Sequence, residues 1–497
     1  MAAATTQQRP WRPIFGWDDT FLKLHVPHDI AAFASQVERE CAELSEEEGS
    51  FGMVQEVQIS DPIGFWDVEA PLYPHRMSST VDLLHRVFQV CRNMTKLTLD
   101  SGHGAGTRVL PIQILLQVLQ EAKHHTCLNR LDVCDFHISC RGGDAMHQIS
   151  NFQNESIRTG SPPLHPGLSQ VCIDRCSFAT NNNLDTAGSV ISSERQSGLD
   201  MLIQLLVNHL PQLEWFNVCS SSSRECLSTE TLQSLIQQAS SLKELRLWNF
   251  TAGPQQLSQA FDCLSTNPLS RLVQLTLPCA LSIEGAQSVA DYLRQPTTVL
   301  QGLTLTINQF VVLHNSSKNG SDSEDDADGS AAANKANHVR ASVKDIWTTI
   351  ADGLQVNQSL ESFRLRGAAK IDYNVCMPIF ANMLEHNHTL QSFSVLNSFS
   401  VLNSVLPANG SLDELCSNAS HNPQIAMYLK LNQHGRKLLL RGNASVVHSN
   451  SNSSSAATKH ALWFKTLSDL SDDISCVFYL LQLNPSLCFS NPTNYDN

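Results

Sequence analysis

A recurring spacing of apolar residues constrains the fold of this chain more than any other feature. Residues 168–178, LSQVCIDRCSF, carry apolar residues at positions 1, 4, 6, 9 and 11 of the segment. The same spacing returns at 128–138, 242–252 and 300–310, with one Asn at the ninth position of the last copy. Alternate side chains of a strand point to opposite faces, so the pattern predicts short strands that place their apolar residues in one shared core.

The predicted strands recur at a regular interval. The residues at the fourth position of each motif are Leu97, Leu131, Val171, Phe216, Leu245, Leu275, Leu303, Phe363 and Phe393. From Phe216 to Leu303 the interval is 28 to 30 residues, which leaves room for one full helix per repeat. Amphipathic patterns at 112–122, 199–210, 231–239, 256–264, 285–293, 346–354 and 376–384 supply those helices. We therefore predict an α/β solenoid whose parallel sheet is covered by helices on its outer side.

Departures from this interval predict the domain organisation. Residues 1–79 are expected to form an irregular, partly helical N-terminal cap with a helix around 30–44, and residues 80–400 the solenoid. Residues 401–497 are expected to form a C-terminal helical cap that contains a Ser/Asn-rich spacer at about 443–458. An acidic, Ser- and Gly-rich stretch doubles one interval and predicts a disordered loop insertion at about 312–340.

Composition limits the partners and the compartment. The formal net charge of −14 argues against nucleic acid or an anionic membrane surface, because both attract basic patches. We find no stretch typical of a signal peptide or of a membrane span, so we expect a cytoplasmic protein, with the nucleus as an alternative. The 15 cysteines show no compact spacing and are expected to be buried thiols. Common nucleotide-binding, hydrolase, zinc-protease and kinase motifs are missing, so we expect no enzymatic activity, cofactor or metal.

The strand motif and its interval resemble the ribonuclease-inhibitor-like class of leucine-rich repeat proteins over about residues 80–400. Near the C-terminus, LKLNQHGRKLLL followed by FYLLQLNPSLC is similar to a tail of uncharacterised leucine-rich repeat proteins of microalgae. The class resemblance implies a curved solenoid with its strands on the concave face, a surface usually used for protein–protein contact. The chain departs from the class pattern at the turn position, where Phe136, Phe250 and Ala280 replace the usual Asn or Cys.

Residues between the apolar positions of the strands are expected on the concave face and are the candidate binding residues. Trp215 and Trp248 lie at nearly equivalent positions of neighbouring repeats and are expected to stand side by side as aromatic anchors. Arg364 and Arg366 are suited to hold a carboxylate or phosphate, unless they pair with nearby acids such as Glu361 or Asp372. The complete set of candidate partner-binding residues is Trp215, Trp248, Arg246, Asp174, Arg175, Arg364 and Arg366.

These observations predict a non-enzymatic scaffold that binds a protein partner, and neither nucleic acid nor membrane, on the concave face. A regulator of a small GTPase is one alternative, but it would need an arginine presented to the transferring phosphate. A substrate receptor of a ubiquitin ligase is another. It would need an N-terminal adaptor-binding domain, for which residues 1–75 look too short and irregular.

Overall fold

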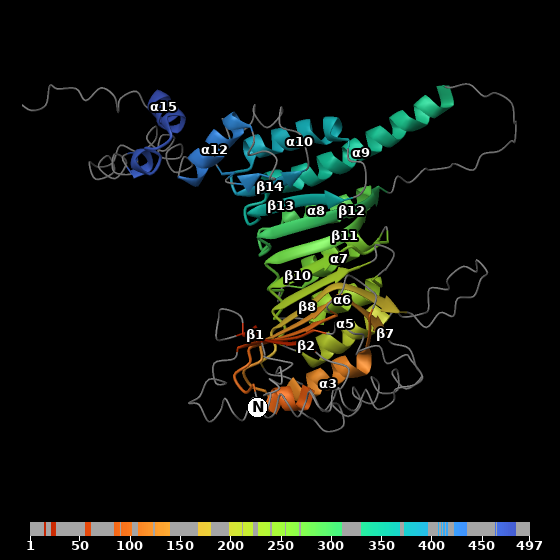
Figure 1. Ribbon diagram of the computed structural model, residues 1–497. Helices are drawn as coiled ribbons and strands as arrows, with labels where there is room; N and C mark the ends of the chain where they lie inside the picture. Colours follow the sequence, from red (N-terminus) through yellow and green to blue (C-terminus); the bar gives the residue numbers. More distant parts are fainter. Residues whose placement is uncertain are drawn as a thin grey trace, which may run out of the picture. The chain divides into compact units, whose positions relative to one another are not determined.

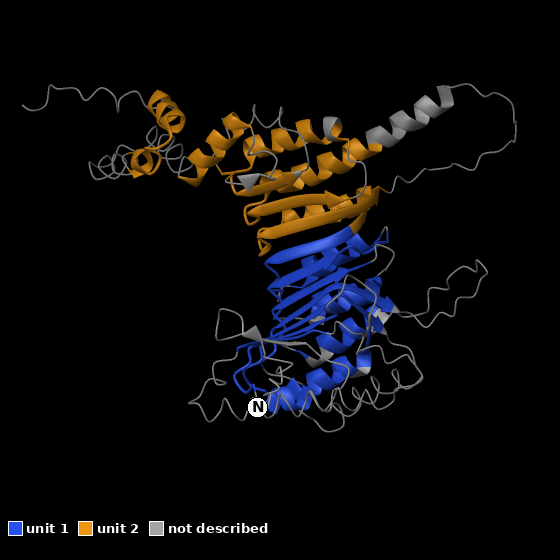
Figure 2. Ribbon diagram, in the orientation of Figure 1, with its two compact units in different colours: residues 1–278 blue, residues 279–497 orange. Residues whose placement is uncertain are grey.

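The structure is a computed structural model that divides into two compact units, residues 1–278 and 279–497 (Figure 2). It describes residues 14–15, 21–25, 55–60, 84–89, 91–101, 108–122, 125–139, 167–179, 198–210, 212–221, 227–238, 241–253, 255–267, 270–310, 330–367, 372–395, 406, 409, 411–412, 414–415, 422–434, 463 and 465–483.

Unit 1 is built on a parallel sheet with one antiparallel strand at its edge (Figure 1). Strand β1 (Ile14–Phe15) runs antiparallel to β2 (Phe21–His25), and all later neighbours run parallel. The following strands of the sheet are β3 (Glu56–Ser60), β4 (Lys96–Asp100), β6 (Arg130–Cys134), β8 (Gln170–Ala179), β9 (Trp215–Ser220), β10 (Glu244–Trp248) and β11 (Gln274–Leu281). The last three residues of β11 fall beyond the boundary of the unit.

A second, smaller sheet in unit 1 pairs β5 (Arg108–Pro111), β7 (Phe136–Ser139) and the end of β8. The chain turns at Asp135, directly before β7, and at Arg175, before the end of β8. The φ angles of these two residues are 64° and 52°, and Asn249 has a similar φ angle of 60°. All three occupy the eighth position of the repeat motif, directly before a fully buried residue. The left-handed backbone therefore aims the ninth residue of the motif into the core.

Helices cover one side of the unit 1 strands (Figure 1). They are α3 (Ile112–Ala122), α5 (Gly198–His209), α6 (Thr229–Gln238) and α7 (Gln256–Thr266), together with a helical segment at 84–89. Their buried faces are rich in Leu, Ile and Val, as the amphipathic patterns require. The helices predicted at 112–122, 199–210, 231–239 and 256–264 are confirmed to within about two residues.

Unit 2 repeats the same alternation. Its strands β12 (Gly302–Phe310), β13 (Ser362–Gly367), β14 (Ser392–Val395) and β15 (Glu414–Leu415) are parallel neighbours. The helices are α8 (Ile283–Leu293), α9 (Ser330–Val356), α10 (Tyr373–His386), α12 (Pro423–Gln433) and α15 (Ile474–Leu483). Trp347 is fully buried, with ring centroids 5.6 Å from Phe310 and 5.8 Å from Phe380. This aromatic cluster is the centre of the unit 2 core.

The strand register confirms the predicted repeat. Leu97 pairs with Leu131, which pairs with Val171, and the series continues through Phe216, Leu245 and Leu275. In unit 2 Leu303, Phe363 and Phe393 are likewise in register. All nine residues are 1% exposed or less. The chain is therefore an α/β leucine-rich repeat fold whose fourth motif positions stack into one apolar column in each unit.

The expected domain organisation can be compared with the described elements. The parallel sheet already includes β2 and β3, within the predicted N-terminal cap, and reaches β15, past residue 400. Helix α9 begins at Ser330, so the end of the predicted disordered insertion 312–340 is helical. The predicted helix at 30–44 and the spacer at 443–458 lie outside the described residues. The cap boundaries at 79 and 401 stay predictions.

An asparagine ladder links the turns of unit 2. Asn387 is 1% exposed; its amide donates to the Leu354 carbonyl oxygen at 2.6 Å, and its Oδ1 accepts from the backbone N–H groups of Thr389 and Leu390. Asn357 and Asn409 make the same pattern in the neighbouring turns, and the Asn432 amide donates to the carbonyl oxygen of Leu412. Each side chain satisfies helix-end and turn groups that would otherwise be buried without partners.

Candidate functional site

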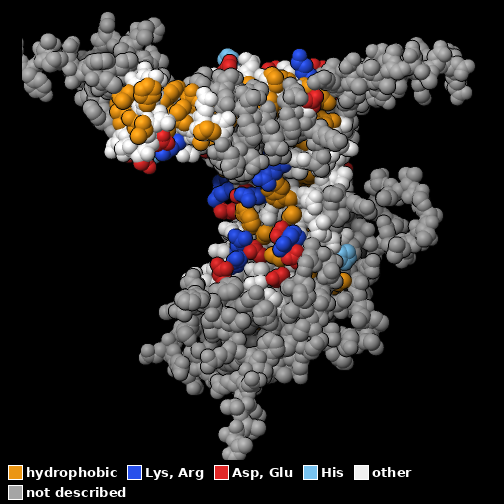
Figure 3. All heavy atoms as spheres, turned by 45° about the horizontal axis from the view of Figure 1, so that its top comes forward, with side chains coloured by type: hydrophobic (Ala, Val, Ile, Leu, Met, Phe, Trp, Pro, Cys, Tyr) orange, Lys and Arg blue, Asp and Glu red, His pale blue; other side chains and the backbone are white. Residues whose placement is uncertain are grey.

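The open face of unit 1 is the sheet side formed by the residues that alternate with the core positions. Its side chains stand in rows because the strands are in register. One row is Glu56, Lys96, Arg130, Gln170, Trp215, Glu244 and Gln274, and the next is Gln58, Thr98, Asp132, Cys172, Asn217, Arg246 and Thr276. Figure 3 shows acidic and basic side chains interspersed on the exposed strands.

Four residues of these rows form a connected cluster. The Arg130 Nε lies 2.9 Å from Asp132 Oδ1, and Lys96 Nζ lies 3.6 Å from Asp132 Oδ2. The Arg130 guanidinium carbon lies 4.9 Å from the centroid of the Trp215 ring, within cation–π range. Burial lowers the pKa of Arg130, but the hydrogen bond and attraction to Asp132 outweigh it and raise the pKa overall. We call Lys96, Arg130, Asp132 and Trp215 the Arg130–Trp215 cluster.

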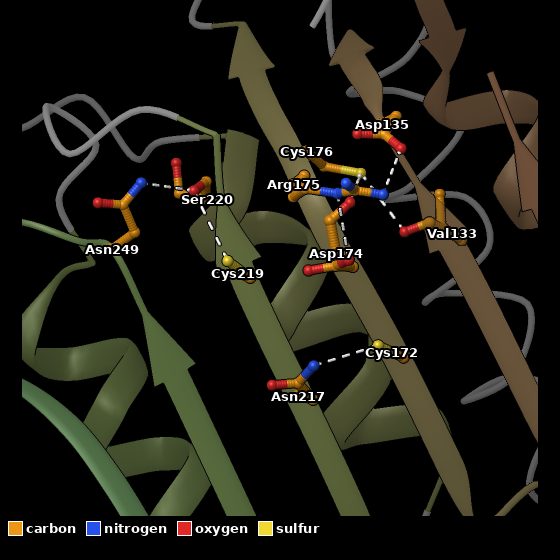
Figure 4. A network of polar contacts seen from close by, with 10 residues as sticks. All are labelled: Val133, Asp135, Cys172, Asp174, Arg175, Cys176, Asn217, Cys219, Ser220 and Asn249. Atoms are coloured by element: carbon orange, nitrogen blue, oxygen red, sulfur yellow. Dashed lines mark hydrogen bonds and ion pairs between the residues drawn. The ribbon is translucent and has the colours of Figure 1, made fainter. Parts of the chain in front are cut away.

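A second polar network ties the strand ends together (Figure 4). The Arg175 Nη2 donates to Asp135 Oδ2 at 2.7 Å, and its Nε lies 3.4 Å from Asp174 Oδ2. The Asn249 amide donates to the Ser220 carbonyl oxygen at 2.8 Å. Because Asp135 and Arg175 are the two turn residues, this ion pair joins neighbouring repeats. Asp174 and Arg175, two candidate binding residues, are therefore brought together, and they also hold the fold.

The thiols of the open face are poor nucleophiles. Burial first, then the neighbouring Cys172, Asp132, Asp174 and Asp100, raise the pKa of Cys134 to about 12. Burial raises the pKa of Cys172 to about 11, against an opposing hydrogen bond from the Asn217 amide. A thiol with such a pKa stays protonated at neutral pH, so neither residue is suited to covalent catalysis.

The two candidate tryptophans do not stand side by side. Trp215 pairs with Glu244, whereas Trp248 pairs with Cys219. They lie on neighbouring strands but four positions apart along them, which corresponds to about 13 Å. Trp215 directly precedes Phe216, the first core residue of β9, whereas Trp248 directly follows Leu247, the second core residue of β10. This difference in motif position separates the two rings. The Arg246 Nε contacts Glu244 Oε1 on its own strand, so this candidate is ion-paired within unit 1.

The remaining candidates, Arg364 and Arg366, lie on β13 of unit 2. Thr304 and Ser394 stand in register on either side of Arg364, and Thr306 stands beside Arg366. The Arg364 Nη2 donates to Ser392 Oγ at 3.5 Å. Arg366 is the more exposed of the two. Their surroundings are thus rich in hydroxyl groups.

Sequence reasoning missed two features of unit 1. The first is that Lys96, Arg130 and Asp132 were not among the candidate residues. Lys96 and Arg130 precede Leu97 and Leu131 as Trp215 precedes Phe216, and this equivalence could have identified them. A cavity of about 590 Å³ lies beside Phe88, Arg92 and Thr126 in the helical layer, and no sequence motif marks it. On its wall His85 Nδ1 lies 2.9 Å from Glu121 Oε2.

Neither a metal centre nor a membrane span emerges from the described residues. Within those ranges, no three His, Cys, Asp or Glu side chains are grouped so that they could hold a metal ion. The helices of the same ranges also fall short of the length and apolar character that crossing a bilayer requires.

Comparison with known proteins gives similarities to solved structures. No protein-family model matches the sequence, and no curated protein matches it. Among solved structures, the leucine-rich repeat-containing protein LegL7 from Legionella pneumophila is similar at 11% sequence identity and a TM-score of 0.37. The similarity covers 82% of this chain and 96% of LegL7.

Proposed function

We propose that this chain is a non-enzymatic scaffold that binds a protein partner on the open face of unit 1. The observation that supports the proposal best is the Arg130–Trp215 cluster. Trp and Arg are the residue types that contribute most to binding energy at protein interfaces. Here the guanidinium of Arg130 reaches across Gln170 of the intervening strand to the ring of Trp215, so a partner can cover both at once.

The cluster is ordered before any partner arrives. Asp132 holds Arg130 and Lys96 on one side, and the indole of Trp215 supports the guanidinium on the other. A side chain that is already fixed loses less rotamer entropy on binding, at about 0.5–1.5 kcal/mol for each flexible side chain. Preorganisation of this kind favours the binding of a partner. The thiols of Cys134 and Cys172 on the same face, whose pKa is raised, are unsuited to act as nucleophiles.

Site-specific photo-crosslinking tests the proposal. A photoreactive amino acid replaces Gln170, which stands between Arg130 and Trp215 in their row, and the full-length protein is irradiated in extract of its source cells. The matched control replaces Gln120, exposed on α3 of the same unit. We expect a protein adduct at position 170 that is absent at position 120 and lost in Trp215→Ala. An adduct that survives Trp215→Ala, or equal adducts at both positions, would refute the proposal.

The two alternative functions lack such support. A GTPase regulator would have to present an arginine to a phosphate, but Arg130, Arg175 and Arg246 are each held by a carboxylate. Residues 1–75 are described only at 14–15, 21–25 and 55–60, as strands and the residue before one of them, so no adaptor-binding helical domain is seen in those ranges. Cytoplasmic or nuclear location stays a prediction.

A further inference from the structure

We propose that the cavity beside Phe88, Arg92 and Thr126 in unit 1 binds a small aromatic carboxylate. The cavity holds about 590 Å³, within the roughly 300–1,000 Å³ of pockets that take small organic ligands. It lies in the helical layer, whereas the Arg130–Trp215 cluster lies on the open face of the sheet. The ligand site therefore goes beyond the proposed scaffold function and does not depend on it.

Two successive repeats form the walls of the cavity. One wall is the helical segment 84–89 with Arg92 beyond it, and the other is the end of α3 with Thr126 beyond it. His85 and Gln89 are four residues apart, so they lie on the same face of their helix. The Gln89 Nε2 lies 2.6 Å from His85 Nε2, and the Arg92 Nε donates to the Gln89 carbonyl oxygen at 3.4 Å. These contacts join the three polar residues of the first wall.

Arg92 supplies an available positive charge on this wall. Its side chain is exposed, and its Nε makes the hydrogen bond to Gln89. Within the part of the chain that the structure describes, the two terminal amino groups of the guanidinium have no acceptor, and no Asp or Glu forms an ion pair with it. A guanidinium with a free edge can donate two parallel hydrogen bonds to the two oxygens of one carboxylate.

The carboxylate of Glu121 on the other wall is already engaged by protein donors. Its Oε2 lies 2.9 Å from His85 Nδ1, and its Oε1 accepts a hydrogen bond from Gln117 Nε2 at 2.9 Å. Glu121 is the acidic residue among the described residues that line the cavity. Because both of its oxygens have partners, Arg92 is the charged group available to a ligand. A single guanidinium matches a carboxylate of one negative charge better than a phosphate group, which carries about two.

An aromatic pair supplies the apolar part of the lining. Phe88 and His125 are buried in the wall, with ring centroids 5.5 Å apart and an interplanar angle of 69°. The His125 Nε2 lies 2.7 Å from the Cys91 carbonyl oxygen, and this contact orients its ring. A flat ring in the cavity can extend the edge-to-face arrangement of the pair. An aromatic acid therefore uses both parts of the cavity, with its ring at Phe88 and its carboxylate at Arg92.

Isothermal titration calorimetry with 2-naphthoate tests the site in the full-length protein. This probe combines a flat ring with one carboxylate. For comparison, 2-naphthamide keeps the ring without the charge, and acetate keeps the charge without the ring. We expect saturable binding of one 2-naphthoate per chain, and binding weaker by about tenfold or more for each of the other two compounds. Absence of saturable 2-naphthoate binding, or equal affinity for 2-naphthamide, overturns the proposal.

Two variants locate the probe in the cavity. Arg92→Gln removes the guanidinium from an exposed position, and it should weaken binding of 2-naphthoate by about tenfold or more through loss of the charge-assisted hydrogen bonds. Gln89→Trp places a large side chain on the wall and should block the probe. The matched control is Arg271→Gln, because Arg271 is another exposed arginine of unit 1. Binding that Arg92→Gln leaves unchanged, or that Arg271→Gln weakens to the same extent, contradicts the site.

A measurement on the unaltered protein removes dependence on the folding of variants. Phenylglyoxal modifies accessible arginines, and mass spectrometry reports each modified position. We expect 2-naphthoate to protect Arg92 and to leave Arg271 unprotected, whereas 2-naphthamide should protect neither. Equal modification of Arg92 with and without 2-naphthoate rejects the assignment of the carboxylate to this guanidinium.

Discussion

Replacing Asn387 by Ala should destabilise unit 2 strongly, because the side chain hydrogen-bonds to four backbone groups, the carbonyl oxygen of Asn357 at 3.4 Å among them. It donates to the Leu354 carbonyl oxygen at 2.6 Å and accepts from the N–H groups of Thr389 and Leu390 at 3.0 and 2.9 Å. The residue is 1% exposed, so water cannot replace these bonds without opening the turn. A buried group left without its partner costs about 1–3 kcal/mol. With partial relaxation, we expect a loss of about 3–4 kcal/mol in the free energy of unfolding.

Urea unfolding and hydrogen exchange measure this loss. Circular dichroism gives the change in the unfolding free energy, and exchange of the amides at 387–393 shows where protection disappears. Asn382→Ala is the matched control, because Asn382 is exposed on α10 in the same repeat and should change stability by less than about 0.5 kcal/mol. If Asn387→Ala lowers the free energy of unfolding by less than about 1 kcal/mol, or if its amides stay as protected as those of the control, the hydrogen bonds of Asn387 do not stabilise unit 2 as argued.

Two further predictions concern packing and thiols. Gly353→Ala should lower the melting temperature despite the better helix propensity of Ala, because the new Cβ would lie 2.7 Å from the Cα of Ala290; Gly253→Ala, with nothing within 4 Å, should not lower it. A thermal melt of both variants decides the matter, and equal melting temperatures would contradict the close approach of α8 and α9. Iodoacetamide at pH 8 should modify the exposed Cys127 first and spare Cys279, whose pKa burial raises to about 12, until urea unfolds the protein. Early modification of Cys279, detected by mass spectrometry, would contradict its burial.

The sequence was sufficient for the fold because the core positions carry large apolar residues at a nearly constant interval. A strand shifted by one residue would turn Leu97 or Phe216 to the open face, so burial of these residues leaves one register. The ends of the sheet were harder to predict. Leu22 of β2 and Leu415 of β15 lack the full repeat motif around them, and only their pairing with Val57 and Phe393 places them in the register of the repeat.

The candidate site was harder to predict, because side chains of the open face are not constrained by the core. The identity of Trp215 and Trp248 was visible in the sequence, but their separation depends on the exact motif position of each. Phe478 shows the same difficulty: it lies in the apolar segment ISCVFYLLQL, yet it is 61% exposed on α15. In a segment that lies outside the repeats, such as α15, apolar character alone does not determine which side chains are buried.

The asparagine ladder was missed although its signal is in the sequence. Asn357, Asn387 and Asn409 are each followed two residues later by Ser or Thr and three residues later by Leu. This pattern matches the glycosylation sequon, a surface signal, so its local form conceals a buried role. Its recurrence along the chain, directly after α9 and α10 and again at Asn409, carries the structural information. In each copy Oδ1 accepts from the N–H groups two and three residues ahead, and the Leu at the third position is buried.

The charges of the open face of unit 1 act on the choice of partner more than on the strength of binding. In unit 1 the ion pairs already satisfy their charges, so a partner that covers them gains little Coulomb energy and must match an existing pattern of both signs. Such a surface contributes selectivity, while the aromatic contact of Trp215 contributes affinity.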